Sequence, residues 1–238
     1  MDKRCSVCLA SYNGEKYIHR QVKSIIDQLS ADDELIVSDD GSSDHTLDII
    51  KKFNDNRIKV YENENKKGPT GNFATALAHA NCDYIFLADQ DDLWLPGRVE
   101  KHMELLQRYE LVISDAVVVN ENGKVLFPSF FKARNSGNGF FKNLKKNSYL
   151  GCCMSFRRSL LDRAFPFPKN LYMHDWWFGL VAELKGSVYF CSDIFLQYVR
   201  HSGNVTQTLE QSLPLSKKIS NRWGFIKGLV VFKIAGKI

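Results

Sequence analysis

No apolar stretch in this sequence reaches the roughly 18 residues that a helix needs to cross a bilayer. Residues 1–10 carry charge but no long hydrophobic stretch, so no secretory signal is expected. Internal repeats and low-complexity segments are also lacking. The 238 residues include 44% hydrophobic and 25% charged side chains, which is typical of a soluble protein with a substantial core. We therefore expect one large domain, or one domain with an elaborated end.

The six cysteines lack the spacing of a complete zinc site. Cys5 and Cys8 are separated by two residues, as in half of such a site, but no second pair has matching spacing. Cys152 and Cys153 are adjacent and cannot supply it. Because most of the cysteines lie in apolar, strand-like segments, we expect reduced, buried thiols of a cytoplasmic protein.

Acidic residues are absent after Glu210, although six basic residues follow it: Lys217, Lys218, Arg222, Lys227, Lys233 and Lys237. These six exceed the net charge of +5 of the whole chain, so residues 1–210 are close to neutral. A near-neutral main body argues against a general nucleic-acid surface, and no nucleic-acid partner is expected. We expect residues 1–210 to form one domain and residues 211–238 to form a basic, apolar tail.

Short apolar strands alternate with amphipathic helices in the first half of the chain. Strands are predicted at 5–10, 35–37, 58–61 and 85–87, and helices around 18–29, 44–50, 73–77 and 99–106. This order predicts an α/β fold with a mainly parallel sheet and helices on both faces. After a strand at 111–114 the pattern loosens. Residues 120–123 are typical of a hairpin turn, and residues 132–147 are predicted to form a mobile loop.

The strand at 85–87 is followed by three acids within four positions, Asp89, Asp91 and Asp92. Open α/β sheets bind ligands at the carboxyl ends of their strands, and crowded carboxylates repel one another unless a cation or a proton intervenes. In an extended chain, Asp89 and Asp91 point the same way and can share one divalent ion. An ordinary acid-rich loop is the alternative. A calcium-binding EF-hand is excluded, because Trp94 stands where its loop needs glycine.

A second acid pair, Asp39 and Asp40, follows the strand at 35–37. Loops after parallel strands meet in one crevice, where these carboxylates can accept hydrogen bonds from a base edge or a ribose hydroxyl. The alternative is an ordinary Asp-Gly turn with Ser43 or Asp44 as a helix cap. Two acid clusters together with a divalent cation suit a nucleoside diphosphate.

Three segments carry a family resemblance, namely Ser11–Ile18, Val37–Asp44 and Ala88–Trp94. In this order they resemble the motifs of the family 2 inverting glycosyltransferases, which have the GT-A (Rossmann-like) fold. Residues 151–156, 173–177 and 198–205 resemble the bacterial branch that includes rhamnosyltransferases of surface-polysaccharide synthesis. The resemblance implies a nucleotide-sugar-binding half at 1–110 and an acceptor-side elaboration at 111–210.

The resemblance implies a role for each matching residue. The nucleotide would contact Ser11, Tyr12, Asn13, Asp39, Asp40 and Asp89. Mg²⁺ or Mn²⁺ would be held by Asp89, Asp91 and His201. Asp175 would be the general base, and the acceptor would contact His174, Trp176 and Trp177.

The implied reaction moves a sugar, such as rhamnose, from a dTDP- or UDP-linked donor to a saccharide or lipid-linked acceptor. It would take place in the cytoplasm or at the cytoplasmic face of a bacterial inner membrane. A sugar nucleotidyltransferase would need a basic, glycine-rich loop after the first strand, and residues 11–14 do not form one. A catalytically inactive protein that binds nucleotide sugars or glycans on the same fold stays open as the alternative.

Four of these residues also have a structural interpretation. Trp176 and Trp177 can belong to the core, and His174 can be a buried hydrogen-bonding residue. Likewise, His201 can lie at the surface or cap a helix. If Asp175 is the base, its large aromatic neighbours desolvate it and raise its pKa toward a useful range.

The tail has two interpretations as well. Apolar residues between the basic ones favour contact with an anionic membrane surface. On a helical projection, however, Lys233 and Lys237 fall near Ile226 and Val230, so a single amphipathic face would be imperfect. The alternative is a helix packed on the domain with a solvated basic rim.

Overall fold

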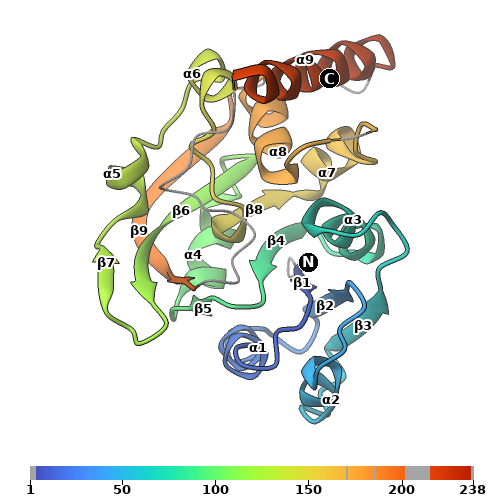
Figure 1. Cartoon of the computed structure of the whole chain (residues 1–238), viewed down its shortest axis with the longest axis vertical. Coiled ribbons are helices and arrows are strands. Elements are labelled where there is room, and N and C mark those ends of the chain that lie inside the picture. The colour runs from blue at the N-terminus through green and yellow to red at the C-terminus, as the bar shows by residue number, and fades with distance from the viewer. Residues whose placement is uncertain (1–3, 170, 185, 202–214, 237–238) are drawn as a thin grey trace.

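The computed structural model describes residues 4–169, 171–184, 186–201 and 215–236. Within these ranges a nine-stranded sheet has the order β3-β2-β1-β4-β8-β6-β9-β5, with β7 paired to β6 (Figure 1). Its strands are β1 Cys5–Ser11, β2 Glu34–Asp39, β3 Ile58–Glu62, β4 Tyr84–Asp89, β5 Leu93–Trp94, β6 Leu111–Asn120, β7 Val125–Phe127, β8 Met154–Arg157 and β9 Val188–Arg200. The helices are α1 Ile18–Ile26, α2 Thr46–Lys51, α3 Pro69–His79, α4 Arg98–Leu105, α5 Phe130–Arg134, α6 Phe140–Lys145, the 3₁₀ turn η1 Gly151–Cys153, α7 Arg158–Ala164, α8 His174–Glu183 and α9 Leu215–Ile234.

The first four strands form the predicted parallel arrangement. β1 pairs in parallel with both β2 and β4, and β2 pairs in parallel with β3. Residues 84–88 of β4 are all buried, as expected for a central strand covered on both faces. The alternating pattern of strands and helices in this half is therefore confirmed.

The second half of the sheet is mixed. β8 runs antiparallel between β4 and β6, whereas β6 and β9 pair in parallel with register shifts around Asp115. The predicted hairpin turn is confirmed, since the Asn120 N–H donates to the Lys124 carbonyl and Gly123 has φ 76°. The division into halves at residue 110 stays a prediction, because a single sheet continues across it.

The predicted mobile loop at 132–147 is wrong over much of its length, because it contains the last turn of α5 and the whole of α6. Ser129 caps α5 by accepting a hydrogen bond from the Lys132 N–H at 3.1 Å. In α6, the fully buried Asn143 donates to the Gly137 carbonyl at 2.9 Å and accepts from the Ser148 hydroxyl at 2.6 Å. Polar side chains in and beside this segment bond within the fold, so its polar composition did not indicate a loop.

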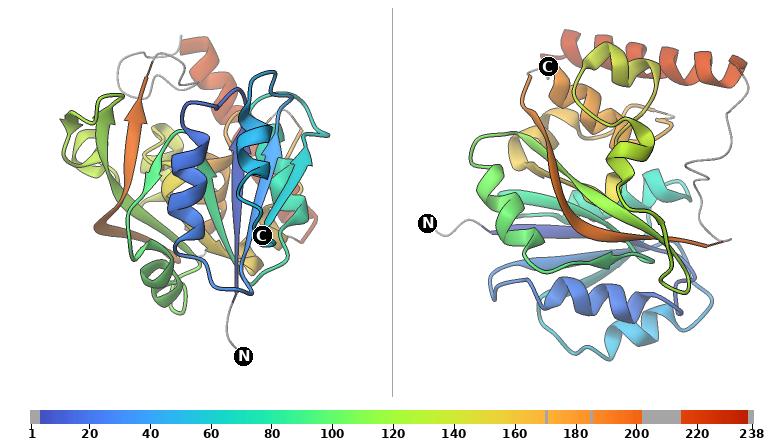
Figure 2. Two further views of the ribbon diagram at one scale, coloured as in Figure 1. Left: turned by 90° about the horizontal axis from the view of Figure 1, so that it is seen from below. Right: turned by 90° about the vertical axis from the view of Figure 1, so that its left-hand side faces the viewer.

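Helices cover both faces of the sheet, as predicted. Figures 1 and 2 show α1 and α2 against one face, whereas α3, α7 and α8 lie on the other. α9 lies outermost, across α8. Within the described part of the chain, all six cysteines are buried and free of disulfides.

Candidate functional site

Three loops that follow parallel strands meet at one edge of the sheet. Ser11 at the end of β1 is in register with Asp39 of β2, and the preceding Ala10 is in register with Asp89 of β4. The parallel pairing therefore brings both predicted acid clusters to the same edge, next to residues 11–14.

The Asp39 carboxylate accepts several hydrogen bonds from neighbouring residues of the fold. Its Oδ1 accepts from the backbone N–H groups of Gly41 and Ser42, at 3.1 and 2.7 Å. Its Oδ2 accepts from the hydroxyls of Ser11 and Ser42, at 2.9 and 2.6 Å. Four donors occupy the roughly four acceptor sites of a carboxylate. Asp39 thus caps the turn at Asp40-Gly41 with its side chain, as the structural interpretation expects of this turn, and it ties the ends of β1 and β2 together.

Asp40 keeps more of its acceptor capacity. Its Oδ1 accepts from the Asn63 side chain at 2.6 Å and its Oδ2 from the Gly68 N–H at 2.8 Å. With one donor on each oxygen, about half of the acceptor sites of this carboxylate are still open. Of the two neighbouring acids, Asp40 is the one able to accept from a ligand without losing an internal bond.

The loop after β1 is fixed to both neighbouring loops. The Tyr12 N–H donates to Gln90 Oε1, and Gln90 Nε2 donates back to the Tyr12 carbonyl, both at 2.8 Å. The Asn13 side chain accepts from the Ser43 N–H at 2.8 Å. The Tyr12 side chain stays 52% exposed, so its ring is accessible to a planar ligand. Gln90, which sequence reasoning missed, is the link between this loop and the acids.

The predicted geometry of Asp89 and Asp91 is wrong, because Gln90 and Asp91 form a turn rather than extended chain. Asp91 instead faces His201, with 2.7 Å between Asp91 Oδ2 and His201 Nε2. The His201 ring also stacks on Tyr17, with 4.7 Å between ring centroids. The surface and capping interpretations of His201 therefore do not hold, because its side chain is only 9% exposed and meets an acid of the predicted metal site.

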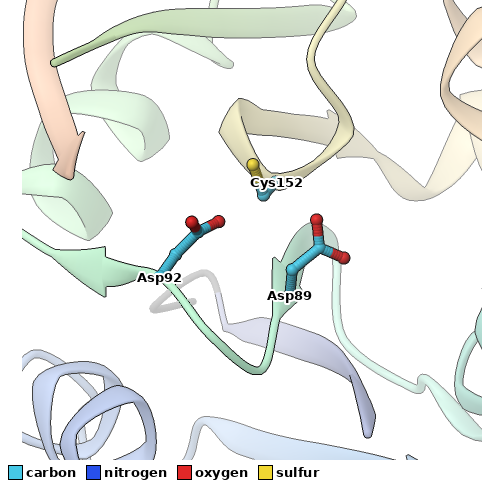
Figure 3. A group of neighbouring side chains, drawn as sticks. All are labelled: Asp89, Asp92 and Cys152. Carbon is cyan, nitrogen blue, oxygen red and sulfur yellow. The ribbon is translucent and has the colours of Figure 1, made fainter. Parts of the chain in front are cut away.

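Asp89 groups with two residues outside the predicted site, Asp92 and Cys152. Oxygen and sulfur atoms of the three side chains lie within 4.8 Å of one another. Figure 3 shows both carboxylates pointing toward the thiol, which comes from η1. Asp92 also accepts from the Val199 N–H at 3.1 Å, so it ties the turn after β4 to β9. Asp92 is visible in the sequence as the third acid of the run, whereas no sequence pattern indicated that Cys152 would lie beside these acids.

Negative charge is concentrated at this edge. Burial, together with the charges of Asp91 and Asp175, raises the pKa of Asp89 to about 7. Burial and the charges of Asp91 and Asp89 raise the pKa of Asp92 well above its usual value. The buried Arg98 guanidinium donates to the Cys152 carbonyl at 2.5 Å and supplies a positive charge behind the cluster. Raised carboxyl pKa values mean that the cluster favours a proton or a bound cation over free negative charge.

Asp175 lies at the start of α8 and faces the same edge from the other half of the fold. Its Oδ1 accepts from the Trp176 N–H at 2.6 Å, and the Asn147 side chain and the Gly151 N–H also donate to its carboxylate. Burial nevertheless dominates and raises the pKa of Asp175 to about 6. Because the charge of Asp175 contributes to the raised pKa of Asp89, the two acids lie within electrostatic range of each other.

The remaining predicted acceptor residues are buried. The His174 ring packs on Phe73 with 4.2 Å between centroids, and burial lowers its pKa to about 3. The indole N–H groups of Trp176 and Trp177 donate to the Asn143 and Ala164 carbonyls, both at 2.8 Å. The burial of both indoles favours the core interpretation over a platform on which a sugar stacks.

The raised pKa of Asp175 predicts a cost to stability that depends on pH. An unfolded aspartate ionises near 3.8 and Asp175 near 6, so the contribution of Asp175 to stability falls as the pH rises between these values and is constant above them. Asp175→Asn does not titrate there. We expect the stability difference between this variant and the wild type to shift in favour of the variant by on the order of 1–3 kcal/mol as the pH rises from about 4 to above 6.

Urea unfolding at a series of pH values checks this expectation, with the exposed Asp162→Asn on α7 as the control. A stability difference between Asp175→Asn and the wild type that is independent of pH would contradict the assigned burial effect.

The comparison with known protein families decides the family. A family model described as glycosyl transferase family 2 matches residues 6–165, more than half of the chain. The chain belongs to glycosyl transferase family 2. The family predicted from the loop motifs is therefore confirmed, and so is the class of enzyme.

Curated relatives of this family 2 glycosyltransferase act in glycan synthesis. WfgD of Escherichia coli, a UDP-Glc:alpha-D-GlcNAc-diphosphoundecaprenol beta-1,3-glucosyltransferase, is 29% identical over 83% of this chain and 77% of its own length. RfbG of Shigella flexneri, a dTDP-rhamnosyl transferase, is 28% identical over 82% of this chain and 72% of its own length.

Solved structures confirm the GT-A fold. TarS residues 1–349 of S. aureus in complex with UDP-GlcNAc superpose with a TM-score of 0.69 and 23% identity, over 94% of this chain and 71% of that chain. The mannosyltransferase PcManGT of Pyrobaculum calidifontis in complex with GDP-Man and Mn²⁺ gives a TM-score of 0.62 and 19% identity, over 99% of this chain and 64% of that one. At these identities the likeness concerns the fold alone.

Proposed function

We propose that this family 2 glycosyltransferase is a metal-dependent, inverting enzyme that transfers a sugar from a UDP- or dTDP-linked donor to a lipid-linked saccharide acceptor. One observation carries the proposal. Asp175, from the second half of the fold, accepts a hydrogen bond from the Gly151 N–H, and the next residue, Cys152, groups with Asp89 at the end of β4. A donor held at the acids and an acceptor held at Asp175 would therefore meet in one site.

The residues around the acids fit a hard divalent cation. Asp91 offers a carboxylate oxygen and His201 a ring nitrogen, 2.7 Å apart at the mouth of the site. Burial and the neighbouring charges of Asp91 and Asp175 raise the pKa of Asp89, so a bound cation would favour its ionised form. Oxygen donors suit Mg²⁺ and Mn²⁺, and the imidazole nitrogen favours Mn²⁺ of the two. When bound, the cation would neutralise charge on the leaving diphosphate.

The loops after β1 and β2 would hold the nucleoside. We assign the contact with the base or ribose to Asp40, because the carboxylate of Asp39 already accepts four internal hydrogen bonds. The exposed ring of Tyr12 would cover the face of the base, and Ser11 and Asn13 would hold the loop in place.

Asp175 would act as the general base. A sugar hydroxyl is a poor nucleophile until its proton is removed, and a buried carboxylate with a pKa of about 6 is ionised at neutral pH yet still basic enough to accept it. Attack by this hydroxyl opposite the leaving nucleotide inverts the anomeric carbon in one displacement. No protein nucleophile is needed, so positioning is the main contribution of the chain.

The names of the relatives support the lipid-linked acceptor, since WfgD acts on a diphosphoundecaprenol-linked sugar. They do not separate the donors, because WfgD uses UDP-Glc and RfbG transfers rhamnose from dTDP. We place the reaction at the cytoplasmic face of the bacterial inner membrane, where such a lipid would present its sugar.

Thermal unfolding with UDP, dTDP, GDP and CMP, each with and without Mn²⁺, tests the nucleotide site. A ligand that binds only the folded protein raises its stability according to its concentration and affinity. We expect a Mn²⁺-dependent rise in Tm for UDP or dTDP and about tenfold weaker binding in Asp40→Asn, because the variant loses one charged acceptor. Asp27→Asn, an exposed acid on α1's C-terminal side, is the matched control.

The outcomes separate the candidate functions. A Tm that no nucleotide changes would rule out the proposed donor site. Nucleotide binding without transfer to any lipid-linked saccharide would favour the alternative, a catalytically inactive nucleotide-sugar-binding protein.

A further inference from the structure

α9 has two apolar faces rather than one. The inner face, Phe225, Leu229 and Phe232, is buried against α8, where Phe225 packs on Trp176 and Phe232 on Trp177. A second apolar stripe points away from the protein and consists of Ile219, Trp223, Ile226, Val230 and Ile234, which are 49%, 58%, 37%, 51% and 82% exposed. Its members are spaced three or four residues apart, so they line one side of the helix. We call these five residues the outer stripe.

Basic side chains flank the outer stripe. From the helical spacing, Lys227 lies along one side of it and Lys233 along the other, and both are exposed. α9 contains no acidic residue, and neither does the rest of the chain after Glu210. The irregular amphipathic pattern of the tail thus has a physical reason, because apolar residues occupy both the packed face and the outer stripe.

We propose that the outer stripe of α9 docks onto an anionic lipid bilayer, with the helix lying in the interface. A surface helix binds such an interface through an apolar face with basic residues beside it. Lys227 and Lys233 can lay their aliphatic stems along the apolar region while their ammonium groups reach lipid phosphates. Trp223 supplies the amphipathic aromatic ring that favours the boundary between headgroups and acyl chains.

No helix of the described residues is long and apolar enough to span a membrane.

A hollow lies beside the docking surface. It has a volume of about 280 Å³ and lies between α9 and the residues Pro168, Lys169, Leu171 and Tyr172. Lys169, Tyr172, Trp223 and Lys227 are among its lining residues. Tyr172 lies three positions before Asp175 in the chain, so one wall of the hollow leads directly into the start of α8, where the proposed base lies. If the proposed function is right, a lipid-linked acceptor would keep its lipid in the bilayer under α9 and reach Asp175 past this hollow.

Co-sedimentation of the full chain with vesicles tests the docking. We expect binding to an equimolar mixture of phosphatidylcholine and phosphatidylglycerol, and about tenfold weaker binding to phosphatidylcholine alone, because the attraction depends on anionic lipid. The triple variant Trp223→Ser, Ile226→Ser, Val230→Ser should bind the anionic vesicles about tenfold more weakly. The double variant Lys227→Glu, Lys233→Glu should do the same.

Each variant has a matched control on a distant surface. Val125, Leu126 and Phe127 of β7 are 52%, 44% and 39% exposed, so their triple serine variant removes a comparable apolar patch. Lys51→Glu, Lys52→Glu at the end of α2, on the opposite side of the molecule in Figure 1, repeats the charge reversal. Both controls should bind vesicles like the wild type. Circular dichroism and Tm verify that all variants fold.

The proposal is overturned if the wild type does not bind anionic vesicles. It is also overturned if the triple serine variant of the outer stripe binds them as well as the triple serine variant of β7 does. It is also overturned if the outer stripe joins two copies of the chain. In that case the wild type would be a dimer in solution, the triple variant would be a monomer, and neither protein would bind vesicles. Vesicle binding needs no nucleotide or acceptor, so Asp175→Asn should sediment like the wild type. Failure of the docking and failure of the proposed function are therefore distinguishable.

Discussion

Asp175→Asn is expected to lower kcat by about 10²–10⁴-fold while donor binding stays unchanged, because the amide cannot accept the proton of the acceptor hydroxyl. The substitution keeps the shape of the side chain and the bond from the Trp176 N–H, so the start of α8 should hold its geometry. Steady-state rates and the nucleotide-induced rise in Tm, measured on the same preparations, separate chemistry from binding.

The dependence of the rate on pH gives a second measurement of the same role. Since the pKa of Asp175 is raised to about 6, the rate for the wild type should be constant above that pH and fall about tenfold per pH unit below it. Asp162→Asn, an exposed acid on α7, should retain the wild-type rate and profile. An Asp175→Asn enzyme with near-normal kcat would exclude Asp175 as the base.

Asp91→Asn and His201→Gln are each expected to reduce the rate on the order of 10²-fold at limiting Mn²⁺, because each removes one ligand from the proposed cation. The double variant is the sharper test. If both side chains serve one ion, losing the second should cost much less than losing the first, since the effects of residues that act as a unit are not additive.

Mn²⁺ titrations of the rate and of the nucleotide-induced Tm shift measure this coupling. Partial recovery of the single variants at high Mn²⁺ is expected, and EDTA should abolish the activity of the wild type. Two independent, multiplicative losses would contradict a shared ion. Coupling that does not change with the Mn²⁺ concentration would mean that the contact between Asp91 and His201 is only an ion pair within the fold. Full activity in EDTA would refute metal dependence altogether.

Much of the site could be predicted from the sequence because the carboxyl ends of parallel strands meet at one edge of the sheet. Each strand in the first half is a short apolar run that ends in turn-forming or acidic residues. Parallel pairing then leaves little freedom, and Asp39 and Asp89 must arrive at one edge beside residues 11–14. The local pattern also specified the hairpin at Asn120 to Gly123, whose residue types require that turn.

The roles within each acid cluster were decided by hydrogen bonds that no local pattern contains. Asp39 and Asp40 are adjacent and chemically identical, yet one accepts four internal donors and the other two. Which donors reach each carboxylate depends on the paths of the neighbouring loops. The turn at Gln90 likewise separated Asp89 from Asp91, contrary to the alternation expected of extended chain.

By itself, then, the sequence determined the order of elements, the edge of the sheet where the acids gather and the family to which the chain belongs. Only the tertiary structure brought His201 to Asp91 across 110 positions, placed Cys152 beside Asp89, and buried Trp176 and Trp177 beneath α9. It also divided the apolar residues of α9 into a packed face and an exposed one. The physical reason is that periodicity fixes which residues share a face, whereas only packing between distant segments fixes what that face meets.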